Sequence, residues 1–225
     1  MIDPRIFIGS SINFKDMFFI YPPKVKDIVN NKEYGMFSSI FMTSQEDIED
    51  MVAKNEDFKG KIPTPLEYML SLAYTNPIFS ELIKKGFFFY THETINFIYE
   101  EKAILIGADI NLATAKDVKD VKLLNEENYF DFQNCIREVN GTDRVEPPDP
   151  NLHPKIKYMR AKARLRDRVK AKKKGMTLTA TLASICCMNL GINPLNIGEI
   201  TYAAIPLLIR YYQEKDKYET DVRSL

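Results

Sequence analysis

A stretch of concentrated positive charge constrains the fold of this chain more than any other feature. The stretch runs from Lys155 to Lys174 and holds eleven Lys or Arg residues against one acid, Asp167. Because unpaired charges are excluded from protein interiors, it has to lie at a surface. The formal net charge of the whole chain is zero, and before Lys155 sixteen basic residues face twenty-five acidic ones. The sequence therefore predicts an acidic body that carries a basic helix or arm.

A proline-rich segment immediately precedes this basic stretch. Residues 142–154, TDRVEPPDPNLHP, include four prolines in thirteen positions and have no helical pattern. Such a composition is typical of a linker between domains. We therefore predict a mixed α+β domain over residues 1–140, a linker over 141–153 and a helical domain over 154–225 that starts with the basic helix.

The rest of the sequence predicts an α+β fold in which helices dominate. Runs of β-branched and aromatic residues predict short strands over 6–9 and 12–21, and a hairpin over 95–99 and 103–106. Apolar spacing and capping signals predict N-terminal helices over 25–30, 33–42, 43–55, 66–74, 77–92 and 125–141. Beyond the linker we expect helices over 154–174, 177–191 and 200–225, the last one kinked at Pro206.

Composition limits the cellular setting. Apolar residues form 45% of the chain, including 14 Phe and 12 Tyr, which is enough to build a real core. The longest apolar runs are far shorter than the roughly 20 residues of a membrane span, and no export signal is visible. An odd number of cysteines, three, favours free thiols in a reducing compartment. We therefore expect a cytoplasmic protein with no membrane partner.

The sequence lacks motifs for catalysis or cofactor binding. Phosphate-binding, dinucleotide-binding and nucleophile-elbow patterns are missing, and the two histidines, His92 and His153, do not cluster with the cysteines at zinc-ligand spacing. His92 follows an aromatic run and is interpreted as a packed or capping residue. We expect no enzyme activity, no metal and no cofactor. A deep pocket that joined His92, Glu93 or Cys135 to other ionisable groups would contradict this expectation.

Three roles are open for the basic stretch. It could bind phosphate groups through counterion release, lie on an acidic surface of its own body or of a partner, or be an exposed connector. Ile156, Met159 and Ala163 follow helical spacing, so a narrow apolar stripe could dock while the rest stays solvated. The predicted basic surface consists of Lys155, Lys157, Arg160, Lys162, Arg164, Arg166, Arg168, Lys170, Lys172, Lys173 and Lys174.

Residues 180–205 have the outline of a helix-turn-helix unit around Leu190-Gly191-Ile192. The second helix of a DNA reader would present basic or amide side chains to base edges. Here the segment NPLNIGEITYAAI contains one acid and no basic residue, so a packed helical hairpin is the preferred interpretation.

Several segments in order resemble structural-module proteins of tailed phages from hosts with AT-rich genomes. They include SQEDIED, TPLEYML, NFIYEEKAILIG, NYFDFQNCIRE and LASICCMNLGINPLNIGEITYAAI. The C-terminal third is also similar to phage tail assembly chaperones. These proteins carry a short helix, a turn like Leu190-Gly191-Ile192, a segment like Gly198-Glu199-Ile200-Thr201-Tyr202, and a long charged helix like Tyr211 to Leu225.

The resemblance implies a non-catalytic factor, made in the infected bacterial cytoplasm, that holds a tape-measure or tail-tube protein during tail assembly. Members of that family often also exist in a longer, frameshifted form. The expected partner-binding residues are Ala204, Leu207, Leu208, Tyr211 and Tyr212. Packing of these residues against Leu182, Ile185 and Met188 is the alternative.

Two other functions stay open. The first is a nucleic-acid-binding regulator or packaging accessory that uses residues 155–174. The second is a permanent virion component. Self-association is a further option.

Overall fold

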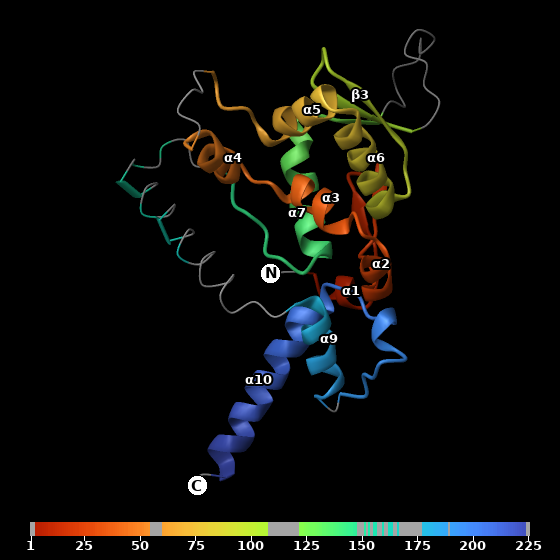
Figure 1. Cartoon of the computed structure of the whole chain (residues 1–225), viewed down its shortest axis with the longest axis vertical. Helices are drawn as coiled ribbons and strands as arrows, with labels where there is room; N and C mark the ends of the chain where they lie inside the picture. Colours follow the sequence, from red (N-terminus) through yellow and green to blue (C-terminus); the bar gives the residue numbers. More distant parts are fainter. Residues whose placement is uncertain are drawn as a thin grey trace.

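Residues 3–54, 60–107, 122–147, 177–188 and 190–223, with single positions between 151 and 166, are described by a computed structural model (Figure 1). The predicted α+β class, with helices dominant, is confirmed. The N-terminal helices are α1 (Pro4–Phe7), α2 (Val25–Asn30), α3 (Tyr34–Met42), α4 (Gln45–Val52), α5 (Pro65–Thr75), α6 (Pro77–Thr91) and α7 (Glu126–Val139). The C-terminal elements are α9 (Leu178–Cys186), the 3-10 helix η2 (Ile197–Glu199) and α10 (Ala204–Arg223).

Two small antiparallel sheets accompany these helices. Strands β1 (Ile12–Phe14) and β2 (Phe18–Ile20) form a hairpin that pairs Phe14 with Phe18. Strands β3 (Ile95–Ile98), β4 (Ala103–Ile106) and β5 (Lys122–Leu124) form the second sheet in that order, and Ile95 pairs with Ile106. The hairpin predicted over 95–99 and 103–106 is confirmed, whereas β5 was not predicted.

Side-chain caps fix the helix starts that the sequence indicates. The Ser44 hydroxyl accepts the backbone N–H of Asp47 at 3.2 Å, and the Asp47 carboxylate accepts the N–H of Ser44 at 2.9 Å. Thr64 and Glu67 form the same reciprocal pair at the start of α5, at 3.2 and 3.0 Å. Each pair satisfies two N–H groups that a helix leaves unpaired, and a cap typically contributes ~1 kcal/mol.

The main core lies between α3, α6 and α7 and is dominated by aromatic rings. Phe87 and Phe132 stack with their ring centroids 5.5 Å apart. Helix α3 comes very close to α6 because residue 86 is glycine, where a Cβ would lie 2.6 Å from the Cβ of Phe37. The fully buried rings are Phe37, Phe41, Phe87, Tyr90 and Phe132.

Helix α7 is covered on most sides, so its polar residues need specific partners. The Gln133 amide donates to the carbonyl oxygens of Phe41 and Thr43, both at 2.9 Å. The buried Glu138 carboxylate accepts two hydrogen bonds from Arg144, at 2.7 and 2.9 Å. These contacts satisfy buried polar groups and hold the chain after α7 against that helix.

Three local predictions are wrong. The strand over 6–9 is replaced by α1, because Asp3 caps a helix that begins at Pro4. The helix predicted over 177–191 ends at Cys186. Pro206 lies in the first turn of α10, where an N–H would have no helical partner, so it breaks no hydrogen bond and gives no reason for a kink.

The helix-turn-helix outline is also not formed. Between α9 and α10 the described residues 190–203 contain a turn at 194–196 and the short η2, and no second α-helix precedes Ala204. Thr201 instead pairs with Lys24 in an isolated antiparallel bridge. The residues expected to form a recognition helix therefore contact the N-terminal part of the chain instead.

The segment that leads into α10 packs against the N-terminal part of the chain. The Val25 N–H donates to the carbonyl of Ile200 at 2.9 Å, and the Tyr202 N–H donates to that of Pro23 at 2.8 Å. Ala203 is 1% exposed and belongs to the main core. The division at residues 141–153 stays a prediction, but residues 200–203 share a core with the N-terminal part.

Candidate functional site

The residues just before α10 are fixed by side-chain contacts to the N-terminal part. The Thr201 hydroxyl donates to the carbonyl of Phe7 at 2.9 Å. The Glu199 carboxylate receives the ammonium groups of Lys24 and Lys26 at 2.8 and 2.7 Å. The hydrogen bonds from Lys24 and then Lys26 lower the pKa of Glu199 to about 2. These exposed ion pairs make a modest contribution to stability, and they orient the turn from which α10 starts.

A glycine after α7 completes this attachment. Gly141 has φ of +71°, and a Cβ there would lie 2.9 Å from the Cα of Ala203 and 3.1 Å from its carbonyl oxygen. Both the backbone conformation and the close approach therefore require glycine. The end of α7 thus lies directly against the residue before α10.

The first turns of α10 pack against α9 in a second, smaller apolar cluster. Ile185 of α9, Ile205 of α10 and Val25 of α2 are buried at its centre. Partly buried residues around them are Leu182, Met188, Ile192, Ile197, Tyr202, Leu208 and Ile209. This cluster holds one side of α10 as far as Ile209.

Beyond Ile209, α10 extends away from the other elements (Figure 1). Leu207, Tyr211 and Tyr218 expose 44%, 57% and 69% of their surfaces. Their spacing of four and seven residues places them on one side of the helix. We call this set the α10 stripe. It is the exposed apolar side of a helix whose base is held by the rest of the fold.

The structure changes the predicted partner-binding set. Ala204 is 8% exposed, so it cannot belong to an exposed surface, because the helix base is covered there. Leu208 packs in the cluster with α9, as the alternative interpretation had it, and Tyr212 is half-buried. Leu207 and Tyr211 are exposed as expected, and Tyr218 is an exposed residue that the sequence interpretation omitted.

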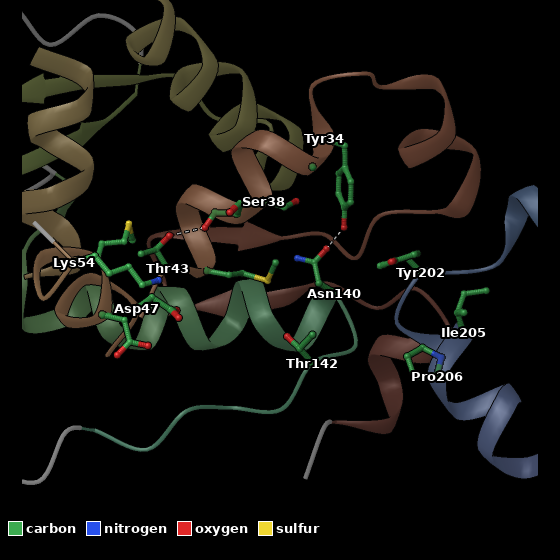
Figure 2. A pocket seen from close by; sticks show the side chains of 15 residues that line it. Tyr34, Ser38, Thr43, Asp47, Lys54, Asn140, Thr142, Tyr202, Ile205 and Pro206 are labelled. Atoms are coloured by element: carbon green, nitrogen blue, oxygen red, sulfur yellow. Dashed lines mark hydrogen bonds between the residues drawn. The ribbon is translucent and has the colours of Figure 1, made fainter. Parts of the chain in front are cut away.

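A cavity of about 660 Å³ lies beside the base of α10 (Figure 2). Its lining comes from α3, α4, the end of α7 and residues 202–206. On one wall the Tyr34 hydroxyl is hydrogen-bonded to Asn140, whose amide donates to Tyr90 at 3.0 Å. The Tyr90 hydroxyl also lies 2.6 Å from that of Ser38. Burial raises the pKa values of Tyr34 and Tyr90, so both phenols stay neutral and serve as structural links between helices.

The end of the cavity near α4 carries Asp47, Asp50 and Lys54, from α4 and the turn after it (Figure 2). The Asp47 carboxylate already accepts from the backbone and hydroxyl of Ser44, at 2.9 and 2.7 Å. The lining contains no histidine or cysteine. The recess is therefore lined by apolar and polar side chains, and Asp47 on its lining is engaged in the cap of α4.

The residues that could have pointed to catalysis lie apart from this cavity. His92 ends α6 in a left-handed conformation, with φ of 60°, and stacks on Tyr21 with ring centroids 4.5 Å apart. Cys135 is buried, and burial raises its pKa to about 11, so it stays a thiol. Glu93, next to His92, is not among the cavity residues either. Within the described ranges no three His, Cys, Asp or Glu residues are grouped as a metal site.

Most of the predicted basic surface lies outside the described residues. Lys155, Lys162 and Arg166 are described, and each is helical and exposed. Ile156 and Met159 between them are 47% and 61% exposed. Not described are Lys157, Arg160, Arg164, Arg168, Lys170, Lys172, Lys173 and Lys174.

Comparisons with models of protein families, with curated proteins and with solved structures gave no match. Across the described part of the chain, no helix combines the length and apolar character that crossing a membrane requires.

Proposed function

We propose that this protein is a non-catalytic assembly factor that binds a partner protein through the α10 stripe. The observation that carries the proposal is the exposure of Leu207, Tyr211 and Tyr218 on one side of a helix with a fixed base. Tyrosine is enriched in the residues that dominate binding energy, because it combines a large apolar ring with a polar tip.

The partner class rests on the sequence resemblance to phage tail assembly chaperones. On that basis the partner is a tape-measure or tail-tube protein in the cytoplasm of an infected bacterium. An exposed helix could cover an aggregation-prone segment of such a protein until that protein assembles. This role requires a binding surface and no catalytic residues.

Co-purification with tape-measure and tail-tube proteins expressed from the same genome tests this proposal. Deletion of the C-terminal third is a poor test, because Ala203 is part of the main core. The double variant Tyr211→Ala/Tyr218→Ala leaves the core intact, since both side chains are more than half exposed. We expect it to weaken partner binding by at least about tenfold, as for removal of central interface tyrosines.

The matched control is Gln213→Ala. Gln213 is exposed and lies two residues after Tyr211, on the opposite side of the helix. It should bind like the unaltered protein. The proposal would be contradicted if Gln213→Ala lost as much partner binding as the double variant. It would also be contradicted if the unaltered protein retained neither tail protein. Presence of the protein in purified particles would favour the virion-component alternative.

The exposed cations that the structure describes between residues 155 and 166 favour a second candidate, binding of nucleic acid. Lys155, Lys162 and Arg166 all face solvent. Charge reversal of these three residues should weaken retention on duplex DNA at low salt and reduce the salt dependence, which should be steep in the unaltered protein. Absence of any gel retardation at low salt removes this candidate.

A further inference from the structure

Helix α5 and strand β3 lie at the end of the molecule opposite the free end of α10 (Figure 1), and contacting aromatic residues come from these elements and the turn after β3. Tyr74, in the last turn of α5, contacts Tyr99, which follows β3, with ring centroids 5.1 Å apart. Tyr99 also stacks on Phe97 of β3 at 5.8 Å. Tyr74 is 73% exposed and Tyr99 38%. We call these three residues the aromatic ledge.

Packing of the fold accounts for Phe97, which contacts the main core, but not for the two exposed tyrosines of the aromatic ledge. An aromatic residue in the core of this protein is typically buried completely, as Phe87 and Phe132 are. Tyr74 instead leaves most of its ring in water and makes its ring contact with another exposed tyrosine. Adjoining exposed rings of this kind mark binding surfaces more often than isolated apolar residues do.

The turn that directly follows Tyr99 in the sequence carries two acidic side chains. Glu100 and Glu101 directly follow Tyr99 and are exposed, and neither forms an ion pair with a described residue. The adjacent cation, Lys102, is held by Glu67 with 2.5 Å between the ammonium nitrogen and a carboxylate oxygen. That contact lowers the pKa of Glu67 and occupies the lysine. Among the residues that the structure describes, no cation pairs with the two carboxylates that follow Tyr99.

We propose that the aromatic ledge is a docking surface for an arginine-bearing segment of a partner protein. A guanidinium group is planar and weakly hydrated, so it stacks on tyrosine faces more readily than a lysine ammonium does. Glu100 and Glu101 complement its charge from the adjoining turn. This surface is separate from the α10 stripe, so the protein presents two docking surfaces at opposite ends.

NMR titration of the full-length protein tests this assignment. The probe is a peptide with three arginines spaced by Gly-Ser, compared with the same peptide carrying lysine or glutamate instead. The arginine peptide should shift the amide signals of Tyr74 and residues 97–101. Tyr74→Ala should weaken its binding about two- to fivefold, the usual range for an exposed cation–π contact. Glu100→Gln/Glu101→Gln should weaken binding and reduce its salt dependence.

Tyr211→Ala, on α10, is the matched control and should bind the arginine peptide normally. Because the two surfaces lie on different elements, this control also distinguishes a failure of the arginine-binding proposal from a failure of the proposed function. Shifts that map elsewhere, equal binding of the glutamate peptide, or full affinity in Tyr74→Ala would each overturn the proposal. So would dimerisation that Tyr74→Ala abolishes, because a second copy would then be the occupant.

Discussion

Substitution of Gly141 with alanine tests whether the chain leading into α10 is clamped against the end of α7. Gly141 has φ of +71°, and its Cα faces the backbone of Ala203. A methyl group added there clashes with main-chain atoms, which cannot change rotamer as a flexible side chain can. The clash is therefore relieved only if the segment that positions α10 moves.

The expected destabilisation has two parts. A non-glycine residue in the left-handed region costs about 1–2 kcal/mol. The new Cβ would lie 2.9 Å from the Cα of Ala203, and overpacking of this kind typically costs about 1–3 kcal/mol. Together they predict a loss of about 3 kcal/mol in the free energy of unfolding, within a total that is usually about 5–15 kcal/mol. For a chain of this length such a loss lowers Tm by roughly 6–12 °C.

Gly191→Ala is the matched control for urea denaturation and thermal melting. Gly191 also has positive φ, +73°, but an added Cβ would meet nothing within 4 Å. It should therefore lose only the backbone part, about 1–2 kcal/mol. The difference between the two variants measures the contact with Ala203. If both variants lose the same stability, the close approach of α7 and Ala203 is refuted.

Three further predictions concern single groups. Because the pKa of Glu199 is lowered to about 2, its pairing stabilises the fold above pH ~4.5 and is lost as pH falls toward about 2. Glu199→Gln should flatten that part of the stability–pH curve, and an unchanged curve would contradict the pairing. Exposed Cys187 should react with a thiol reagent in the folded protein, whereas Cys135, whose pKa burial raises to about 11, should react only on unfolding; equal rates would contradict its burial. Tyr90→Phe should destabilise the fold by about 1–3 kcal/mol in urea denaturation, because it removes hydrogen bonds inside the core; an unchanged midpoint would show that they contribute nothing.

Local signals explain most of what could be predicted about the fold. The starts of α4 and α5 follow from reciprocal caps between residues three positions apart, Ser44 with Asp47 and Thr64 with Glu67. The β3–β4 hairpin likewise depends on neighbouring residues. In contrast, the course of residues 199–203 depends on partners such as Lys24, which is 175 positions away from Glu199. No pattern within a short window of sequence contains that information.

The same limit applies to the candidate site. The sequence correctly indicated a long C-terminal helix with apolar residues, but not which of its sides is covered. The position of α9 decides this, because α9 covers Leu208 and leaves Leu207 and Tyr211 open. Tyr218 belongs to the open side by helical spacing, a signal that was present in the sequence. Ala204 was misplaced because its burial depends on the fold around the helix base.

The free half of α10 connects the fold to the proposed binding function. From Arg210 to Arg223 it spans fourteen residues, or about 21 Å at the helical rise. An isolated helix of that length is marginal in water, so it depends on the packed turns around Ile205 for its nucleation. Yet its exposed residues add almost nothing to the core, while the base is attached by a backbone bridge, two ion pairs and a glycine contact. This attachment fixes the direction in which α10 leaves the fold, as the proposed binding of a partner through the α10 stripe requires.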